Sequence, residues 1–142
     1  MTEATAAVTP LDRVMELYEK DDLVRRLGIT IVSVEAGRVE LALEPNEDTL
    51  NSHALVHGGM VFILADTAFA YAFASHGRPA VTTQGEIAYL APALSGVRLT
   101  AVAAEVHRKG AVGIYDVLVT DTRGEAIASF RGQGRIPRAP AA

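Results

Sequence analysis

The longest apolar segment of the chain covers residues 60–75, where Asp66 is the only charged residue. It is rich in Ala, Leu, Met and Phe, follows Gly58-Gly59 and stops shortly before Pro79. Glycine and proline at these places are typical helix boundary signals, and the segment is longer than an ordinary strand. We therefore predict a helix here. Because it is apolar on all sides, it must be buried.

The segments on both sides of this helix have the patterns of β-strands. Residues 29–34 are rich in β-branched side chains, residues 35–37 suit a turn, and residues 38–43 alternate, which predicts a hairpin with one buried face. Four more strands are predicted after the helix, the last three as a meander. These strands are expected at residues 80–90, 97–106, 111–120 and 125–133, with turns at residues 107–110 and 123–124.

The N-terminal part predicts an additional amphipathic helix. Apolar residues recur at roughly helical spacing among charges in residues 11–27, with a possible break at Asp21-Asp22. The ends of the chain, residues 1–10 and 137–142, have the composition of flexible termini. We thus expect one α+β domain at residues 11–136, in which an antiparallel sheet covers the long helix. A single sheet cannot cover a wholly apolar helix, so a second copy of the chain is expected to pair with it.

Composition adds limits on what the protein can be. The 142 residues contain no cysteine, so disulfides and thiolate metal sites are excluded, and a cytoplasmic location fits. The formal net charge of −4 and pI near 5.5 argue against a nucleic-acid binder, which usually carries a basic face. We find no signal peptide and no segment long enough to span a membrane. No metal-ligand motif or nucleotide-binding motif is present, so chemistry without a cofactor is expected.

Asp66 and the helix start are the candidate chemical groups. A carboxylate among apolar side chains either finds a partner or has its pKa raised, and a raised pKa is common in catalytic acids and bases; the alternative is a purely structural pairing. The first N–H groups of a helix lack internal acceptors and can bind an oxyanion, and His57-Gly58-Gly59 would let a substrate approach them. The alternative for this motif is a tight turn.

The spacing of these two features predicts a shared site between subunits. Asp66 follows Gly58 by eight residues, which is about 12 Å along a helix. A carbonyl bound to the Gly58 N–H is therefore beyond the reach of Asp66 of the same chain, because attack needs about 3–3.5 Å. Two helices packed antiparallel about a two-fold axis would bring Asp66 of one subunit towards Gly58 of the other.

His57-Gly58-Gly59 followed by the segment LADTAFA at residues 64–70 resembles the hotdog-fold acyl-CoA thioesterases, and most closely the PaaI-type phenylacetyl-CoA thioesterases. The resemblance extends over residues 29–133. It implies a hotdog fold, in which the sheet wraps around the central helix, dimers share one continuous sheet and contain two shared active sites, and dimers pair into a homotetramer. The implied substrate is an acyl-CoA, with CoA as part of the substrate and no separate cofactor.

The resemblance also implies roles for individual residues. Asp66 would be the nucleophile or the general base, Gly58 and Asn51 would position the thioester carbonyl or the water, and His57 would shape the turn or contact the thioester. Asn51 is otherwise a simple turn residue. Further candidates for substrate binding are Gly59, Thr82 or Thr83 for orienting a water, Phe69 together with Phe62, Tyr71 and Phe73 for an aromatic acyl group, and Arg78, Arg108, Lys109 and Arg131 for CoA phosphates.

Several of these residues have simpler explanations. Threonine is common in strands, aromatic residues of a buried helix are usually core, and charges at a hairpin tip are usually only solvated. The predicted reaction is hydrolysis of a phenylacetyl-type or hydroxyphenylacetyl-type CoA thioester, as in phenylacetate degradation. The alternatives are a hotdog dehydratase or hydratase of 3-hydroxyacyl thioesters, using His57 with Asp66, and a non-catalytic acyl-CoA-binding module.

Overall fold

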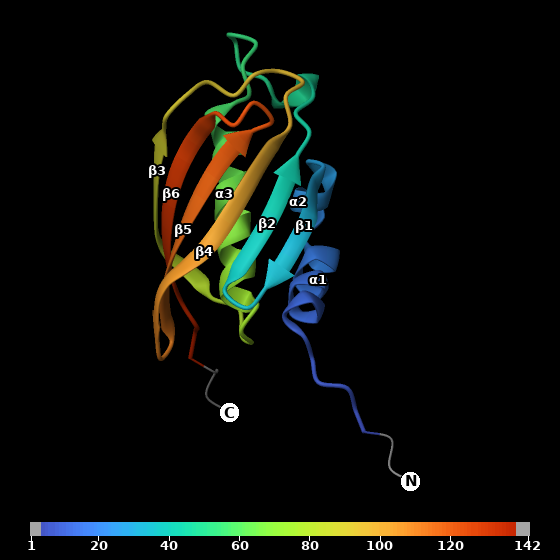
Figure 1. The fold of residues 1–142 in the computed structure, drawn as a ribbon, viewed down its shortest axis with the longest axis vertical. Coiled ribbons are helices and arrows are strands. Elements are labelled where there is room, and N and C mark those ends of the chain that lie inside the picture. The colour runs from blue at the N-terminus through green and yellow to red at the C-terminus, as the bar shows by residue number, and fades with distance from the viewer. Residues whose placement is uncertain (1–3, 139–142) are drawn as a thin grey trace.

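One antiparallel sheet forms most of the structure, a computed structural model that describes residues 4–138. The parts of the predicted flexible termini at residues 1–3 and 139–142 lie outside the described residues. The six strands are arranged in the order β1-β2-β4-β5-β6-β3 (Figure 1). Their bounds are β1 Ile29–Glu35, β2 Arg38–Leu43, β3 Val81–Tyr89, β4 Leu99–Lys109, β5 Val112–Asp121 and β6 Ala126–Arg135.

The predicted central helix is α3, Gly58–Ala74, which lies along one face of the sheet (Figure 1). Most of its side chains are buried, including Leu64 and Phe69. It begins two residues before the predicted start, because His57 is the N-cap and its imidazole accepts a hydrogen bond from the Gly59 N–H. A sheet packed around a long central helix is the hotdog arrangement, so the predicted α+β class and fold are confirmed.

Glycines in the sheet allow α3 to lie close to the strands. A Cβ atom at Gly132 would lie 2.7 Å from Phe69, and one at Gly113 would lie 2.8 Å from Phe73. Both distances are shorter than any ordinary contact, so these phenyl rings occupy the space that a side chain would need. Phe69 and Phe73 also pack against Tyr115, with ring centroids 5.7 and 5.6 Å away. The aromatic side chains of the helix therefore form the centre of the core.

The predicted N-terminal amphipathic helix is present as two pieces, α1 Pro10–Lys20 and α2 Asp22–Arg26. The predicted break is confirmed, since Asp21 ends one helix and begins the next. α1 starts with a capping box in which the side chains of Thr9 and Asp12 each accept a hydrogen bond from the other's backbone N–H. It packs against α3 and β1 (Figure 1).

The predicted turn at residues 107–110 is wrong. β4 continues through His107, Arg108 and Lys109, and only Gly110-Ala111 joins it to β5. This end of β4 is exposed on both faces, so its side chains show no alternation of apolar and polar residues, and the backbone ladder to β5 alone keeps it extended. Gly110 takes the positive φ of 58° that such a short loop needs.

The last strand of the sheet, β3, pairs only with β6 among the described residues, and its other edge is open (Figure 1). Eight of its nine residues are exposed. An open edge of this length presents a row of backbone groups to another chain. Between residues 4 and 138, no helix is long and apolar enough to cross a membrane.

Candidate active site at the start of α3

A groove of about 360 Å³ lies beside the N-terminal end of α3. It is formed by the loop before the helix, the first turn of the helix and the segment that follows β3. The loop is fixed in place because the Val56 N–H donates to Ala93 O at 2.9 Å and the His57 N–H donates to Thr49 O at 2.8 Å. The lining residues include Asn51, Leu55, Gly58, Val61, Tyr89 and Pro92.

The Gly58 N–H is the free donor at the helix start. The Gly59 N–H donates to His57 Nδ1 at 2.9 Å, and the Met60 and Val61 N–H groups donate to His57 O at 2.9 and 3.3 Å. Among the described residues, the Gly58 N–H has no acceptor. It also carries part of the positive end of the helix dipole, so it can bind a carbonyl oxygen or an oxyanion. Gly59, predicted to bind substrate as well, has its N–H occupied.

His57 caps the helix through one specific ring nitrogen. Nδ1 accepts the hydrogen bond from Gly59, so the proton of the neutral ring is on Nε2. The side chain is exposed, and His57 lies between Val56 and Gly58, which both line the groove. This geometry gives His57 a role in shaping the helix start, and only Nε2 remains available to a substrate.

The two interpretations of Asn51 apply to different atoms of its side chain. Oδ1 accepts hydrogen bonds from the N–H groups of His53 and Leu55 at 2.9 and 3.2 Å, which makes it a turn residue. The side-chain amide nitrogen donates to no group in residues 4–138, and Asn51 lines the groove beside Gly58. Its oxygen therefore builds the loop, while its NH₂ group is available as a second donor.

Tyr89 is a groove residue that the sequence did not identify as functional. Its hydroxyl donates to Gly58 O at 2.8 Å, and a Cβ atom at Gly58 would lie 3.2 Å from its ring. The ring therefore covers the first residue of α3, and its hydroxyl holds the peptide that directly follows the free N–H of Gly58. Nothing in the linear pattern links a tyrosine at the end of a strand to a glycine 31 residues earlier.

Asp66 lies in the middle of the one stripe of α3 that the sheet leaves partly uncovered. Phe62, Ile63 and Ala70, one turn before and after it, are also only partly buried. Within the described part of the chain, its carboxylate has neither a hydrogen bond nor an ion pair, so the predicted structural pairing is not observed. Burial among apolar neighbours raises the pKa of Asp66 above its ordinary value.

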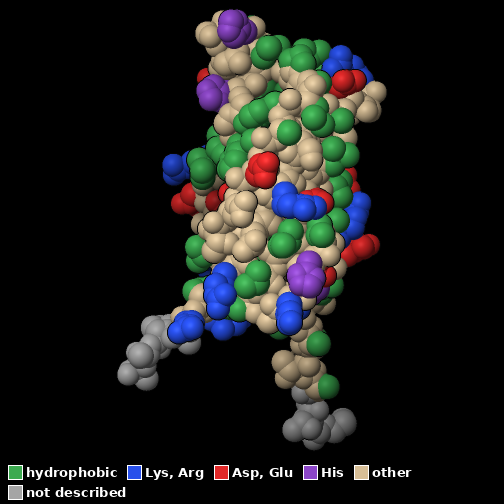
Figure 2. Space-filling model, turned by 90° about the vertical axis from the view of Figure 1, so that its left-hand side faces the viewer, with side chains coloured by type: hydrophobic (Ala, Val, Ile, Leu, Met, Phe, Trp, Pro, Cys, Tyr) green, Lys and Arg blue, Asp and Glu red, His purple; other side chains and the backbone are tan. Residues whose placement is uncertain are grey.

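The other predicted contact residues lie at the opposite end of α3. Arg78 follows the helix, Thr82 and Thr83 begin β3, and Arg108 and Lys109 end β4. A helix of 17 residues separates them from Gly58 by about 24 Å. Figure 2 shows Lys and Arg side chains gathered at this end of the face that carries β3. Within one chain, the predicted site is thus divided between two ends.

Some of these groups already have partners. The Arg78 guanidinium donates to Pro137 O at 3.0 Å, and the Thr83 hydroxyl donates to Gln133 O at 3.1 Å. Arg131 forms a paired contact with Asp116 at 2.6 and 2.8 Å on the outer face of the sheet. Thr82, Arg108 and Lys109 are exposed and have no side-chain hydrogen bond within residues 4–138.

Phe69 has an exposed fraction of 1% and lies in the core against Gly132, away from either end. In a single chain it therefore lines no surface groove. Phe73 is equally buried, whereas Phe62 is partly exposed and packs edge-on against Phe130 at 5.4 Å. Of the predicted aromatic set, Phe62 and Tyr71 come nearest to open space, Phe62 beside Asp66 and Tyr71 at a second pocket.

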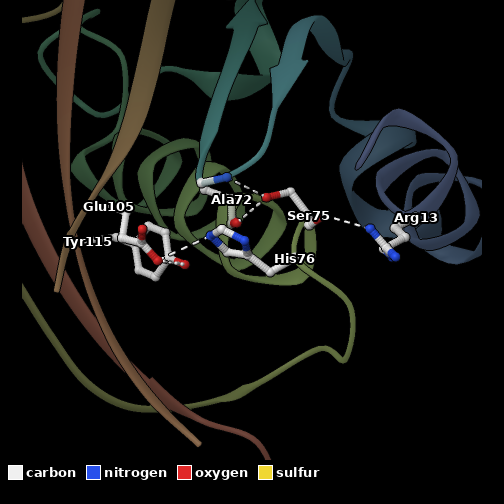
Figure 3. Close-up of polar contacts among 7 residues, drawn as sticks. Arg13, Ala72, Ser75, His76, Glu105 and Tyr115 are labelled. Atoms are coloured by element: carbon white, nitrogen blue, oxygen red, sulfur yellow. Dashed lines mark hydrogen bonds and ion pairs between the residues drawn. The ribbon is translucent and has the colours of Figure 1, made fainter. Parts of the chain in front are cut away.

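A separate polar cluster closes the C-terminal end of α3 (Figure 3). The Ser75 hydroxyl accepts from the Gly37 N–H at 2.8 Å and donates to Ala72 O at 2.6 Å, and Arg13 donates to the Ser75 carbonyl at 3.2 Å. These bonds join α1, α3 and the β1–β2 turn. The cluster is structural and lies at the other end of the helix from Gly58.

His76 and Glu105 belong to the same cluster (Figure 3). His76 Nε2 lies 3.1 Å from Glu105 Oε1, a distance that suits an ion pair, but its geometry does not satisfy a hydrogen bond. Tyr115 donates to the same carboxylate at 3.2 Å. No three His, Cys, Asp or Glu side chains in the described ranges gather closely enough to hold a metal ion.

Comparison with known proteins relates this geometry to a family. Residues 53–128 match the family model of the thioesterase superfamily. The chain is 38% identical to the acyl-coenzyme A thioesterase PaaI of Escherichia coli K12 over 82% of its length and 84% of the relative. The structure of the E. coli PaaI protein from the phenylacetic acid degradation operon superposes with a TM-score of 0.90, 33% identity, and coverage of 94% of this chain and 98% of that one.

One of the similar structures contains a ligand. A Streptococcus mutans protein whose structure contains acetyl-CoA superposes with a TM-score of 0.75 and 29% identity, over 77% of this chain and 88% of that one.

Proposed function

Because this chain belongs to the thioesterase superfamily, we propose that it hydrolyses an aromatic acyl-CoA thioester to the free acid and CoA. The acyl group is of the phenylacetyl or hydroxyphenylacetyl type, and the reaction serves phenylacetate degradation. The proposal is supported by the E. coli relative, which is named as an acyl-CoA thioesterase, and by that relative's operon. The observation that carries it is that one helix holds both the Gly58 N–H and the Asp66 carboxylate, and neither group has a hydrogen-bond partner within residues 4–138.

These two groups meet in a homodimer with two shared sites. Phe62 lies midway between Gly58 and Asp66 along α3, and a Cβ atom at Gly85 would lie 3.5 Å from its ring. Gly85 is the middle residue of β3, the open edge strand. If two β3 strands pair antiparallel about a two-fold axis at Gly85, Asp66 lies level with Gly58 of the partner subunit. The distance of about 12 Å that separates the groups within one chain is then bridged between chains.

The surface around β3 supports this arrangement. Val81, Tyr89 and Leu90 are large apolar side chains with exposed fractions of 54–59%, and pairing would bury them together with the open edge. The same register brings Thr82 opposite Ala88 of the partner subunit. The basic end of one chain then faces the Gly58 end of the other, where CoA phosphates need cations. The two halves of the predicted site become one.

The chemistry follows from the positions of the two groups. The thioester carbonyl oxygen accepts a hydrogen bond from the Gly58 N–H, and the Asn51 NH₂ group is a second donor. If Asp66 is the general base, it takes a proton from water while the water oxygen attacks the carbonyl carbon. The negative charge that develops on the carbonyl oxygen is stabilised by the Gly58 N–H. Collapse of this intermediate breaks the C–S bond, and the proton held by Asp66 passes to the leaving thiolate.

A nucleophilic Asp66 is the alternative within the same site. Its carboxylate would attack the carbonyl carbon directly, CoA thiolate would leave, and water would then hydrolyse the mixed anhydride. A single turnover in water labelled with heavy oxygen tests for the nucleophilic route, because label on the protein can arise only from that route. Attack of water on the Asp66 side of the anhydride transfers the label to the protein, whereas general-base catalysis transfers it only to the released acid.

Release of free thiol from phenylacetyl-CoA tests the proposed function, with acetyl-CoA and a long-chain acyl-CoA for comparison. We expect Asp66→Asn to keep the oligomer and to lose at least about 100-fold in kcat/KM. Asp48→Asn, a change at an exposed carboxylate on the 3-10 helix Glu47–Thr49, is the matched control and should retain the wild-type rate. Full activity of Asp66→Asn would eliminate Asp66 as the catalytic group.

Hydration of crotonyl-CoA without thiol release would instead favour the dehydratase or hydratase alternative, in which His57 moves a proton. The occupied Nδ1 of His57 leaves only Nε2 for that role. Size-exclusion chromatography with light scattering measures the oligomeric state. The homodimer is the assembly that this site requires, while the homotetramer and the cytoplasmic location stay predictions from the sequence.

A further inference from the structure

The peptide group between Gly58 and Gly59 is held at both ends by side chains. Its N–H, which belongs to Gly59, donates to His57 Nδ1 at 2.9 Å, and its carbonyl, which belongs to Gly58, accepts from the Tyr89 hydroxyl at 2.8 Å. The imidazole fits closely, since a Cβ atom at Gly59 would lie 3.0 Å from Nδ1. Two consecutive glycines allow backbone rotations that other residues do not. The direction of the free Gly58 N–H therefore depends on these two side chains.

The hydrogen bond from Gly59 exists only while the ring of His57 is neutral. Nδ1 accepts this bond through its lone pair, and the same lone pair takes up the proton when the imidazole becomes charged. In the imidazolium, two N–H groups would face each other, so the ring must turn away. Its positive charge would also lie at the positive end of the helix dipole. Histidine side chains gain a proton within about pH 5–8, so this change falls in the range in which enzymes work.

Several titratable side chains lie on the elements packed around His57. They are Glu47 and Asp48 on the 3-10 helix, His53 in the loop, Tyr89 at the end of β3 and Asp66 further along α3, while residues 90–93 carry none. In the proposed dimer, the basic end that contains Arg108 of the partner subunit also faces this region. His57 forms no ion pair within residues 4–138, and the bond from Gly59 is the one hydrogen bond that its ring makes there.

We propose that His57 is a proton-controlled positioning residue, whose neutral ring aims the Gly58 N–H at the thioester carbonyl and whose protonation on Nδ1 releases it. This inference rests on the proposed function, because it takes the carbonyl oxygen to lie on the Gly58 N–H. Tyr89 alone holds the peptide group once His57 is charged, so the donor no longer matches the developing oxyanion. Acid then acts on the site twice, through the proton on Asp66 and through loss of the bond from Gly59.

Two isosteric substitutions separate the two ring nitrogens of His57. Asparagine places its Oδ1 where Nδ1 lies, so His57→Asn keeps an N-cap acceptor that does not titrate. Glutamine places its Oε1 near the position of Nε2, so His57→Gln loses the bond from Gly59. At about pH 8, we expect His57→Asn to stay within about threefold of the wild-type kcat and His57→Gln to lose at least about tenfold. The opposite order would overturn the inference, because it would identify Nε2 as the functional nitrogen.

The pH profile of kcat/KM measures the proton control itself, by thiol release from phenylacetyl-CoA between about pH 8 and about pH 5. For the wild type, the logarithm of kcat/KM should fall with a slope that approaches two, because Asp66 and His57 must both be deprotonated. His57→Asn should keep only the limb of Asp66, with a slope of one. His53→Asn changes an exposed histidine with no side-chain hydrogen bond in the described residues and should keep the wild-type profile. Equal profiles for the wild type and His57→Asn, with thiol release that still needs Asp66, would overturn this inference and leave the proposed function standing.

Nuclear magnetic resonance tests the bond without substrate, in protein labelled with heavy-nitrogen glycine. The amide proton signal of Gly59 should move upfield as the pH falls through this range, and it should stay in place in His57→Asn. A Gly59 signal that does not respond to pH in the wild type would overturn the inference whatever the turnover. Absence of thiol release from any ester, with the assembly intact by light scattering, would instead reject the proposed function and the catalytic part of this inference with it.

Discussion

Replacing Gly132 by alanine should destabilise the fold, because Gly132 is where Phe69 contacts the sheet. The added Cβ atom would lie 2.7 Å from Cγ and Cδ1 of Phe69 and 2.9 Å from Cε1. Because three ring atoms of Phe69 would lie closer than an ordinary van der Waals contact, a small rotation of the ring cannot relieve the clash. The ring is also fixed on its other sides by Tyr115 and Phe130, with centroids 5.7 and 6.2 Å away. The helix or the strand must therefore move.

Forcing one additional carbon into such a core costs about 1–3 kcal/mol. The unfolding entropy of a chain of 142 residues is roughly 0.3 kcal/mol per degree, at about 2.1 cal/mol/K per residue. The melting temperature should therefore fall by about 3–10 °C. Gly85, which pairs with Gly132 across the two strands, is the matched control. A Cβ atom there would lie no closer than 3.4 Å from its neighbours in the same chain, so Gly85→Ala should lower the melting temperature less than Gly132→Ala does.

Thermal unfolding followed by circular dichroism measures both variants under the same conditions. Equal melting temperatures for Gly132→Ala and the wild type would refute the reasoning, since they would show that Phe69 has room to move. Equal losses for both glycine variants would also contradict it, because the cost would then come from the strand backbone. A large loss only at Gly132 would establish Phe69 as a core residue.

Four further outcomes are expected. The raised pKa of Asp66 should make kcat/KM fall on acidification at a pH above the ordinary range of an aspartate, and this limb should vanish in Asp66→Asn. Because the pKa of Asp66 is higher in the folded chain than in the unfolded chain, ionisation of Asp66 lowers the free energy of unfolding as pH rises above the unfolded-chain pKa. In a thermal scan at pH 7, Asp66→Asn should therefore have a melting temperature no lower than that of the wild type. Tyr89→Phe removes the bond to Gly58 O and should lower kcat by up to about tenfold, measured by thiol release at saturation, with little change in melting temperature. Ser75→Ala leaves the buried Gly37 N–H without an acceptor and should cost about 1–3 kcal/mol in urea unfolding; an unchanged midpoint would show that water replaces the hydroxyl.

The sequence by itself determined the elements that depend on local pattern. The apolar run that became α3, the hairpin before it and the meander after it follow from periodicity and turn residues, and the break at Asp21 was visible in the charges. The lone carboxylate and the two glycines at the helix start could also be identified from the sequence alone. Their spacing of eight residues, combined with helix geometry, already predicted a site shared between subunits.

The tertiary structure decided what depends on residues far apart in the chain. It brought Tyr89 onto Gly58 and Tyr71 onto Asp21, and it put Thr82 and the basic residues at the end of α3 remote from Gly58. It also extended β4 through a charged segment, since a ladder of backbone hydrogen bonds does not require apolar side chains. Periodicity predicts which face of an element is buried, but it does not show which residues cover that face. Strand order and packing across the sheet set those contacts, and they exist only once the chain is folded.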